Sequence, residues 1–168
     1  MLVLSTGLNI LSIPKLTLTD EQRGNMQRWV DALESGNYKQ GQSSLRTDKD
    51  CYCCLGVAAD VHPNTTKESW FKQDPDSFYH YITRDDSGGS HLPRHMVSSF
   101  GLSNEWGFYI WGTDDPNGDW AELYSLPDLN DSFAVPFKDI AAILKIAMTG
   151  GLDPDRVEET SGMKAKKD

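Results

Sequence analysis

The chain has 168 residues, of which 38% are hydrophobic, and its formal net charge is −9. That length suits one compact domain. The low hydrophobic fraction understates the apolar surface that the chain can bury, because the five tryptophans, six tyrosines and six phenylalanines each bury a large area. The acidic balance argues against direct nucleic-acid binding, which needs a basic surface, and it permits a positively charged protein partner.

The stretch of residues 2–18 mixes apolar side chains with serine and threonine. Pro14 has no amide hydrogen to donate to a neighbouring strand. We therefore expect this stretch to form an edge strand or a loosely docked arm rather than a central strand. No lysine or arginine precedes the apolar residues 1–4, and polar residues follow them, so we expect no signal peptide. No run approaches the roughly 18 apolar residues of a membrane span, and we expect no membrane partner.

A capping-box pattern at Thr19 and Gln22 predicts the start of a helix. The apolar residues that follow recur at helical spacing and form one stripe: Met26, Trp29, Val30 and Leu33. Gly36 predicts the end of this helix, because glycine readily adopts the left-handed conformation that closes a helix. Residues 37–50 are mostly polar and predict a loop.

Three cysteines, Cys51, Cys53 and Cys54, lie close together at the start of a nearly uncharged run. Thiols this close in sequence seldom reach disulfide geometry, and an odd number of them suits a reducing compartment. We therefore expect a cytoplasmic protein. Residues 54–61 predict a short buried helix, because they contain alanines and no run of β-branched residues; a buried strand is the alternative.

The second half of the chain predicts a small sheet and further helices. Residues 78–83 are aromatic and prone to form a strand, and residues 107–111 and 120–126 flank a turn signal in the manner of a hairpin. A short helix is predicted over residues 93–100, with Gly101 directly after its end.

Residues 129–132 predict a tight connection into a last helix that begins near Pro136 and ends at Gly150. The apolar face of this helix consists of Phe137, Ile140, Ala141, Leu144 and Met148. Helices at both ends, packed on a small antiparallel sheet rich in aromatic residues, predict an α+β fold. We expect residues 1–152 to form a single domain and residues 153–168 to form a charged tail.

A cysteine nucleophile is one functional hypothesis. Cys53 and Cys54 lie at the start of a predicted helix, where unpaired amides and the helix dipole lower the pKa of a thiol. Downstream histidines would supply a base, and Asn130 or Asp131 an orienting group, which is the chain order of papain-like thiol hydrolases. The candidate catalytic set is Cys54, His95 and Asp131, with Cys53, His80, His91 and Asn130 as substitutes. The competing interpretation is that the cysteines are buried and structural.

A metal site is a second hypothesis, because the cysteines and His62 would together offer four ligands. Structural zinc sites, however, use pairs of ligands separated by a few residues, whereas the cysteines here are crowded. We therefore predict no metal. No glycine-rich phosphate loop occurs in the sequence, and we predict no cofactor.

A binding surface is a third hypothesis, because aromatic residues are concentrated in the predicted sheet and interleaved with arginine and histidine. Strand alternation sends side chains to both faces of a sheet, so some of these rings would be exposed. Such rings suit a small polar ligand with a flat ring, or a protein hot spot. The candidate ligand-binding residues are Trp106, Tyr109, Trp111, Arg94 and His91. The alternative is that the rings form the core of a domain poor in aliphatic residues.

Several stretches of the chain resemble a group of small proteins of bacteriophages and prophages. The resemblance lies in residues 29–41, which read W-x-x-A-L-x-S-G-x-Y-x-Q-G, and in residues 53–57, which read C-C-L-G-V. The L-N-D of residues 129–131 and the F-x-x-I-A of residues 137–141 also match. The resemblance implies expression inside an infected bacterial cell, and thus in the host cytoplasm. It implies no catalytic residue.

The leading hypothesis from the sequence is a non-enzymatic accessory protein that binds a host or phage protein or a small nucleotide-like ligand, as in counter-defence. It rests on the acidic charge, the aromatic sheet and the lack of a complete catalytic motif. The alternative is a cysteine-dependent hydrolase with a Cys-His-Asp/Asn arrangement. Thiol reactivity separates the two, because a catalytic thiol reacts readily near neutral pH and a buried one does not.

Overall fold

The structure, a computed structural model, describes residues 1–84 and 87–153, so the predicted charged tail lies outside the described residues from position 154 onward. The helices are α1 (Asp20–Glu34), α2 (Cys54–Val61), α3 (Arg94–Phe100), α4 (Leu126–Asp131), α5 (Phe137–Thr149) and the short 3-10 helix η1 (Lys67–Ser69). The strands are β1 (Leu2–Val3), β2 (Asn9–Ser12), β3 (Lys39–Gln40), β4 (Cys51–Tyr52), β5 (Trp70–Lys72), β6 (Tyr79–Ile82), β7 (Ser87–Gly88), β8 (Tyr109–Thr113) and β9 (Glu122–Ser125). Within the described ranges, no helix is both long and apolar enough to cross a membrane.

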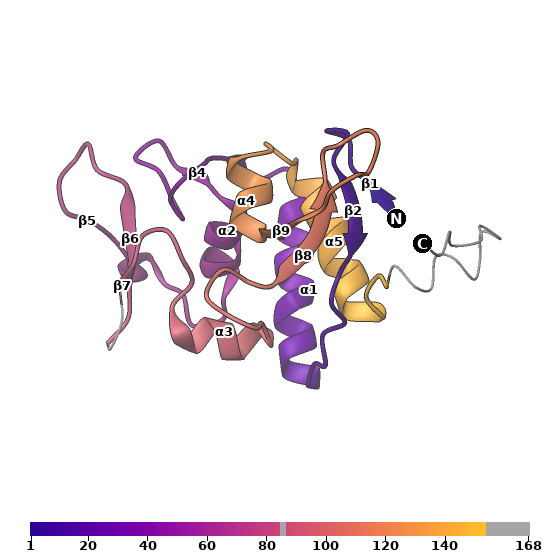
Figure 1. Ribbon diagram of the computed structural model, residues 1–168. Helices are drawn as coiled ribbons and strands as arrows, with labels where there is room; N and C mark the ends of the chain where they lie inside the picture. The colour runs from indigo at the N-terminus through magenta and orange to yellow at the C-terminus, as the bar shows by residue number, and fades with distance from the viewer. Residues whose placement is uncertain (85–86, 154–168) are drawn as a thin grey trace.

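Helix α1 lies in the middle of the molecule, with α2, α3 and α5 packed against it (Figure 1). The capping box predicted from the sequence is present: Gln22 N donates to Thr19 Oγ1 at 3.2 Å, and Thr19 N donates to Gln22 Oε1 at 2.9 Å. The predicted apolar stripe is buried, and the indole N–H of Trp29 donates to the carbonyl oxygen of Cys54 at 2.9 Å. Helix α1 is therefore anchored directly on the cysteine segment.

A four-stranded antiparallel sheet has the strand order β1-β2-β8-β9. Strand β1 forms an edge, as predicted for the N-terminal stretch, but β2 is an inner strand, and there the prediction was wrong. Strand β2 ends before Pro14, so the missing amide of the proline removes no hydrogen bond from the sheet. Ile110 pairs with Tyr124 on the buried face, whereas Trp111 pairs with Leu123 on the exposed face.

Strands β5, β6 and β7 form a second antiparallel sheet, at the left of Figure 1, and β3 and β4 form a parallel pair. The backbone of Arg46 joins the two, because it bridges Tyr52 on β4 and Tyr79 on β6. The amide of Tyr79 donates to the carbonyl oxygen of Arg46 at 2.9 Å. Helices and antiparallel sheets thus share one hydrophobic core, which confirms the predicted α+β fold.

The predicted helices over residues 54–61 and 93–100 and near the C-terminus are present. The predicted tight connection at residues 129–132 was wrong, because most of it belongs to α4, which begins directly after β9. A second capping box explains this early start. Asp128 N donates to Ser125 Oγ at 3.3 Å, and Ser125 N donates to Asp128 Oδ2 at 2.7 Å.

Candidate functional site

Three of the sequence motifs, in residues 29–41, 53–57 and 129–131, meet around the fully buried side chain of Asn130. Its Oδ1 accepts hydrogen bonds from Gln40 Nε2 at 2.9 Å and from Cys54 N at 3.2 Å. Its Nδ2 donates to the carbonyl oxygen of Gly41 at 2.8 Å and to Asp131 Oδ1 at 2.7 Å. We call this network the Asn130 junction. Both the oxygen and the nitrogen of the Asn130 amide are paired, so this side chain holds the segments together.

Two glycines of the same motifs allow the chain to approach itself closely beside the junction. A Cβ atom on Gly56 would lie 1.7 Å from the carbonyl oxygen of Leu45, and one on Gly41 would lie 2.8 Å from the Cβ atom of Cys51. Both distances are far inside van der Waals contact. Packing of Leu45 against α2 therefore explains the glycine at position 56, and packing of Gly41 against Cys51 in β4 explains the glycine at position 41.

Cys53 and Cys54 are buried beside this junction. Gly56 N donates to Cys53 Sγ at 3.4 Å, and Cys54 Sγ donates to the carbonyl oxygen of Leu126 at 3.7 Å. Burial raises the pKa of Cys53 to about 12 and raises that of Cys54 well above the ordinary value of a thiol. The cysteine-nucleophile hypothesis needed a pKa lowered by the helix N-terminus, whereas desolvation of the thiolate here outweighs the favourable amides. The structure agrees with the competing interpretation, in which these two cysteines are buried in the core.

The structure brings two members of the candidate catalytic set together and places the third elsewhere. Asp131 bonds to the side chain of Asn130, which also binds the amide of Cys54. His95 instead packs edge to face on His62, with ring centroids 5.4 Å apart, and His62 directly follows the last residue of α2, the helix that Cys54 begins. Among the described residues, neither buried thiol has a hydrogen bond to an imidazole.

The four residues considered as metal ligands are also divided between the two ends of α2. Cys51, Cys53 and Cys54 precede or begin this helix, and His62 follows it. His62 is occupied as well, because its Nδ1 accepts a hydrogen bond from Asn64 N at 3.2 Å. In the part of the chain that the structure describes, no group of three or more histidine, cysteine, aspartate or glutamate side chains is placed to hold a metal ion.

The candidate ligand-binding residues come from several elements of the fold. His91 and Trp106 contact each other, with ring centroids 5.6 Å apart. Arg94 begins α3 and lines a pocket with neighbours from β6. Tyr109 and Trp111 lie on β8 with their side chains exposed. Strand alternation was thus a sound guide to the exposure of Tyr109 and Trp111.

A cluster of exposed apolar side chains covers the outer face of the four-stranded sheet. The exposed fractions are 46% for Tyr109, 49% for Trp111 and 48% for Leu123. These three side chains, which we call the outer face, help to line a shallow hollow of about 450 Å³ together with Lys15 and Leu152. The sequence analysis missed Leu123, although its pairing with Trp111 across the predicted hairpin would have indicated it.

The segment that carries the outer face is strongly acidic. Residues 95–137 contain no lysine or arginine, and their acidic residues are Glu105, Asp114, Asp115, Asp119, Glu122, Asp128 and Asp131. Four of the seven lie in the β8–β9 hairpin or its turn. Asp115 shapes that turn, because its carboxylate accepts hydrogen bonds from Asn117 N at 3.0 Å and Asp119 N at 2.7 Å. An aromatic face beside a uniformly negative turn is therefore the main surface feature of this hairpin.

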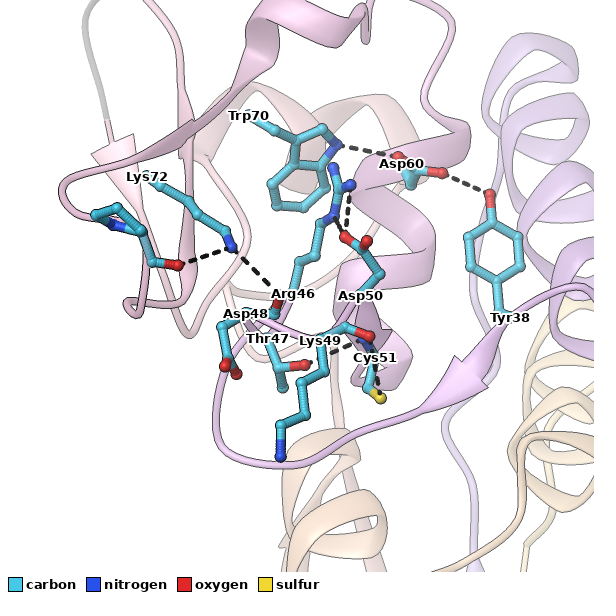
Figure 2. Close-up of polar contacts among 11 residues, drawn as sticks. Tyr38, Arg46, Thr47, Asp48, Lys49, Asp50, Cys51, Asp60, Trp70 and Lys72 are labelled. Carbon is cyan, nitrogen blue, oxygen red and sulfur yellow. Dashed lines mark hydrogen bonds and ion pairs between the residues drawn. The ribbon is translucent and has the colours of Figure 1, made fainter.

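A second cluster of aromatic and charged residues, shown in Figure 2, has a structural role because its members bind one another. The guanidinium of Arg46 lies 3.9 Å from the ring centroid of Tyr79 and bonds to the carboxylate of Asp50 at 2.7 Å. Nearby, Asp60 accepts hydrogen bonds from the hydroxyl of Tyr38 at 2.6 Å and from Trp70 Nε1 at 3.0 Å (Figure 2). These contacts tie α2 to the second sheet. Sequence reasoning missed them because the partners come from separate segments.

Comparison with known proteins gives one match. The family model of a domain of unknown function (DUF8296) matches residues 23–148, a span that runs from α1 to α5 and contains both the Asn130 junction and the outer face. Neither the curated proteins nor the solved structures that were compared match the chain.

Proposed function

This chain belongs to the family described as a domain of unknown function (DUF8296), and from that premise we propose that it works by binding a partner protein through its outer face. The observation that carries the proposal is the combination of three half-exposed apolar side chains with the acidic β8–β9 hairpin. Contiguous apolar surface on a folded domain marks an interaction site, and tyrosine and tryptophan are the side chains that most often dominate binding energy.

The charge of the hairpin determines the chemistry of the partner. A segment that carries lysine or arginine beside apolar residues would cover Trp111 and Leu123 while its cations meet the carboxylates of the turn, such as Asp114 and Asp119. Complementary charge speeds association and makes it sensitive to salt, whereas the buried apolar anchors slow dissociation. The partner that fits the outer face is thus a basic protein with an exposed apolar segment.

The resemblance to phage and prophage proteins supports a host or phage protein as this partner, and counter-defence as the role. The alternative hypothesis, a cysteine-dependent hydrolase, has no comparable support from the geometry. Its nucleophile, Cys54, is fully buried, and its base, His95, packs against His62 beyond the far end of α2. A thiol that remains protonated in the core does not attack a substrate.

Site-specific photo-cross-linking tests the proposal. A photoreactive amino acid replaces Leu123 on the outer face or, as the matched control, Phe71, which is 51% exposed on β5 of the second sheet. Each protein is expressed in bacterial cells and irradiated. We expect Leu123 to cross-link to a basic protein. We expect Trp111→Ser to abolish that adduct, Phe71→Ser to leave it unchanged, and added salt to weaken it in lysate.

Several results would contradict the proposal. Equal adducts from positions 123 and 71 would show non-specific contact, and the absence of any adduct from position 123 would leave the outer face without a protein partner. A cross-link from position 123 to residues 154–168 of the same chain, or to a second copy of the chain, would assign the outer face to a different occupant.

A further inference from the structure

Strand β9 is a free edge of the four-stranded sheet. The strand order is β1-β2-β8-β9, and among the described residues β9 pairs only with β8. The other edge strand, β1, has two residues, whereas β9 has four. An edge strand presents a row of amide and carbonyl groups to which an extended chain can add as a further strand. The free edge of β9 therefore offers a second binding feature next to the outer face.

A hydrogen bond in the α4 capping box shows which groups of β9 point away from β8. In an antiparallel ladder, residues that bond to the neighbouring strand alternate with residues whose amide and carbonyl groups point to the other side. Ser125 N donates to Asp128 Oδ2 at 2.7 Å, so Ser125 is of the second kind. Alternation then makes Tyr124 a residue of the first kind and Leu123 a residue of the second. In the part of the chain that the structure describes, the N–H and C=O of Leu123 have no backbone partner outside the sheet, and both can pair with an added strand.

The space around Leu123 is open on both faces of the sheet. On the outer face is the hollow of about 450 Å³ described above, and a second hollow of about 330 Å³ is lined by β9, α4 and the residues directly after α4. Glu122 and Tyr124 line this second hollow, and strand alternation directs their side chains to the face opposite Leu123. Leu123 itself lines both hollows. An added strand can therefore reach the free edge of β9.

The two faces beside this edge differ in chemistry. The outer face presents the apolar cross-strand pair of Trp111 and Leu123. The second hollow presents two carboxylates, those of Glu122 and Asp128, and among the described residues that line it there is no lysine or arginine. A strand added to β9 would direct alternate side chains to these two faces. The edge therefore suits an extended segment in which apolar and basic residues alternate.

We propose that a segment of the basic partner protein binds as an extended strand added to the free edge of β9. This inference rests on the proposed function, because it specifies how the partner meets the outer face. The apolar side chains of the segment extend the outer face beside Leu123, and its basic side chains meet the carboxylates of Glu122 and Asp128. Hydrogen bonds to the main chain of Leu123 contribute affinity, and the alternating side chains contribute specificity.

Two short peptides of the same composition test this inference on the wild-type chain. In the first peptide, lysine and leucine alternate, as in a strand with one apolar face. In the second, the same residues follow the order of an amphipathic helix. Isothermal titration measures both affinities. We expect the alternating peptide to bind more tightly by roughly tenfold or more, because only its side chains match both faces of the edge while its main chain pairs with β9.

Methylation of the peptide main chain shows whether it pairs with β9. In an added strand, the N–H groups of every second residue face β9 and the others face solvent. Two variants of the alternating peptide, one methylated at the central leucine amides and the other at the central lysine amides, are therefore matched controls for each other. We expect one variant to bind more weakly by roughly tenfold or more and the other to bind within about twofold of the parent peptide. Loss in the leucine variant indicates an antiparallel strand, and loss in the lysine variant a parallel one.

Amide hydrogen exchange followed by NMR gives a measurement on the protein itself. The amide of Leu123 should exchange more slowly when the alternating peptide is bound, and the amides of β1, at the other edge, should not change. Failure of both peptides to bind would contradict the proposed function together with this inference. Three results would overturn strand addition alone and leave the outer face as a binding surface: helical-order peptide binding as tightly as the alternating one, equal effects of the two methylation patterns, or no slowing of exchange at Leu123.

Discussion

At the scale of single residues, the side chain of Asn130 joins parts of the chain that are distant in sequence. It binds Gln40 and Gly41, which precede the cysteine segment, and the amide of Cys54, which begins α2, while Asn130 itself lies on α4. A buried polar network of this kind stabilises the fold only while each member is paired, because an unpaired buried group carries the full cost of its lost hydration.

Replacement of Asn130 with alanine should therefore destabilise the protein. The change leaves the carbonyl oxygen of Gly41 and the amide of Cys54 without their partners. We expect the free energy of unfolding to fall by roughly 2–4 kcal/mol in denaturant titrations. Asn117→Ala, in the exposed β8–β9 turn, is the control and should change it by less than about 0.5 kcal/mol. Wild-type stability in Asn130→Ala would contradict the structural role of the junction.

The burial of two thiols gives a second residue-scale prediction. In the native protein at pH 7, an alkylating reagent should modify only Cys51, which is half-buried, and Cys53 and Cys54 should react only after unfolding. Mass spectrometry of tryptic peptides counts the labels. The variant Cys51→Ser should then show no native-state labelling. Rapid labelling of this variant near neutral pH would favour the hydrolase alternative.

At the scale of elements, helix α2 packs against the main chain of Leu45 at a distance that only glycine permits. Position 56 has no room for a methyl group, because the carbonyl oxygen of Leu45 occupies the space. The contact sets the spacing between α2 and the segment that leads into β4, and through it the place of the Asn130 junction.

Two glycine-to-alanine changes in helices should therefore have opposite effects. Gly56→Ala forces α2 away from Leu45 and should cost roughly 3 kcal/mol or more of unfolding free energy, as other severe overpacking does. Gly24→Ala lies in α1, where an added Cβ meets nothing within 4 Å, and should stabilise the protein by about 0.5–1 kcal/mol. Chemical denaturation measures both. A loss for Gly56→Ala no larger than about 0.5 kcal/mol would show that α2 packs differently.

The elements that the sequence predicted well are those defined by local chemistry. The Thr19–Gln22 capping box and the apolar stripe of α1 need only neighbours along the chain, and the hairpin of β8 and β9 needs only a turn signal between two strand-like runs. The inner position of β2 and the Arg46 cluster depend on pairing between distant segments, which no local pattern encodes. The Asn130 junction could not be predicted for the same reason, although the residues that form it lie in motifs that the sequence shows separately.

At the scale of the whole molecule, the acidic charge is unevenly distributed along the chain. The hairpin that carries the outer face lies within a stretch that contains seven carboxylates and no lysine or arginine, although the whole chain has 16 lysines and arginines. Composition alone could not indicate this surface, because a net charge of −9 does not show where the carboxylates are concentrated.

Global stability should depend on pH through His62. Burial, with help from His95 and Arg28, lowers the pKa of His62 from 6.5 to about 4 in the folded protein. Between these values the unfolded chain binds a proton that the folded chain does not, so the stabilising contribution is complete above pH 6.5 and is lost as pH falls toward 4. Unfolding titrations across this range should show the loss, and His62→Phe should reduce the slope. An unchanged slope would contradict a neutral, buried imidazole.

The central claim is that the outer face binds a basic protein. The indole N–H signals of the five tryptophans in a nitrogen-15 NMR spectrum test it most directly. A synthetic amphipathic peptide of lysine and leucine serves as the basic partner, and its glutamate and leucine counterpart is the control. We predict that the basic peptide shifts the signal of Trp111 on the outer face and leaves those of Trp29 and Trp70, which are hydrogen-bonded in the interior, unchanged, and that the acidic peptide shifts none. An unmoved Trp111 signal, or an equal response to both peptides, would contradict recognition of a basic partner by the outer face.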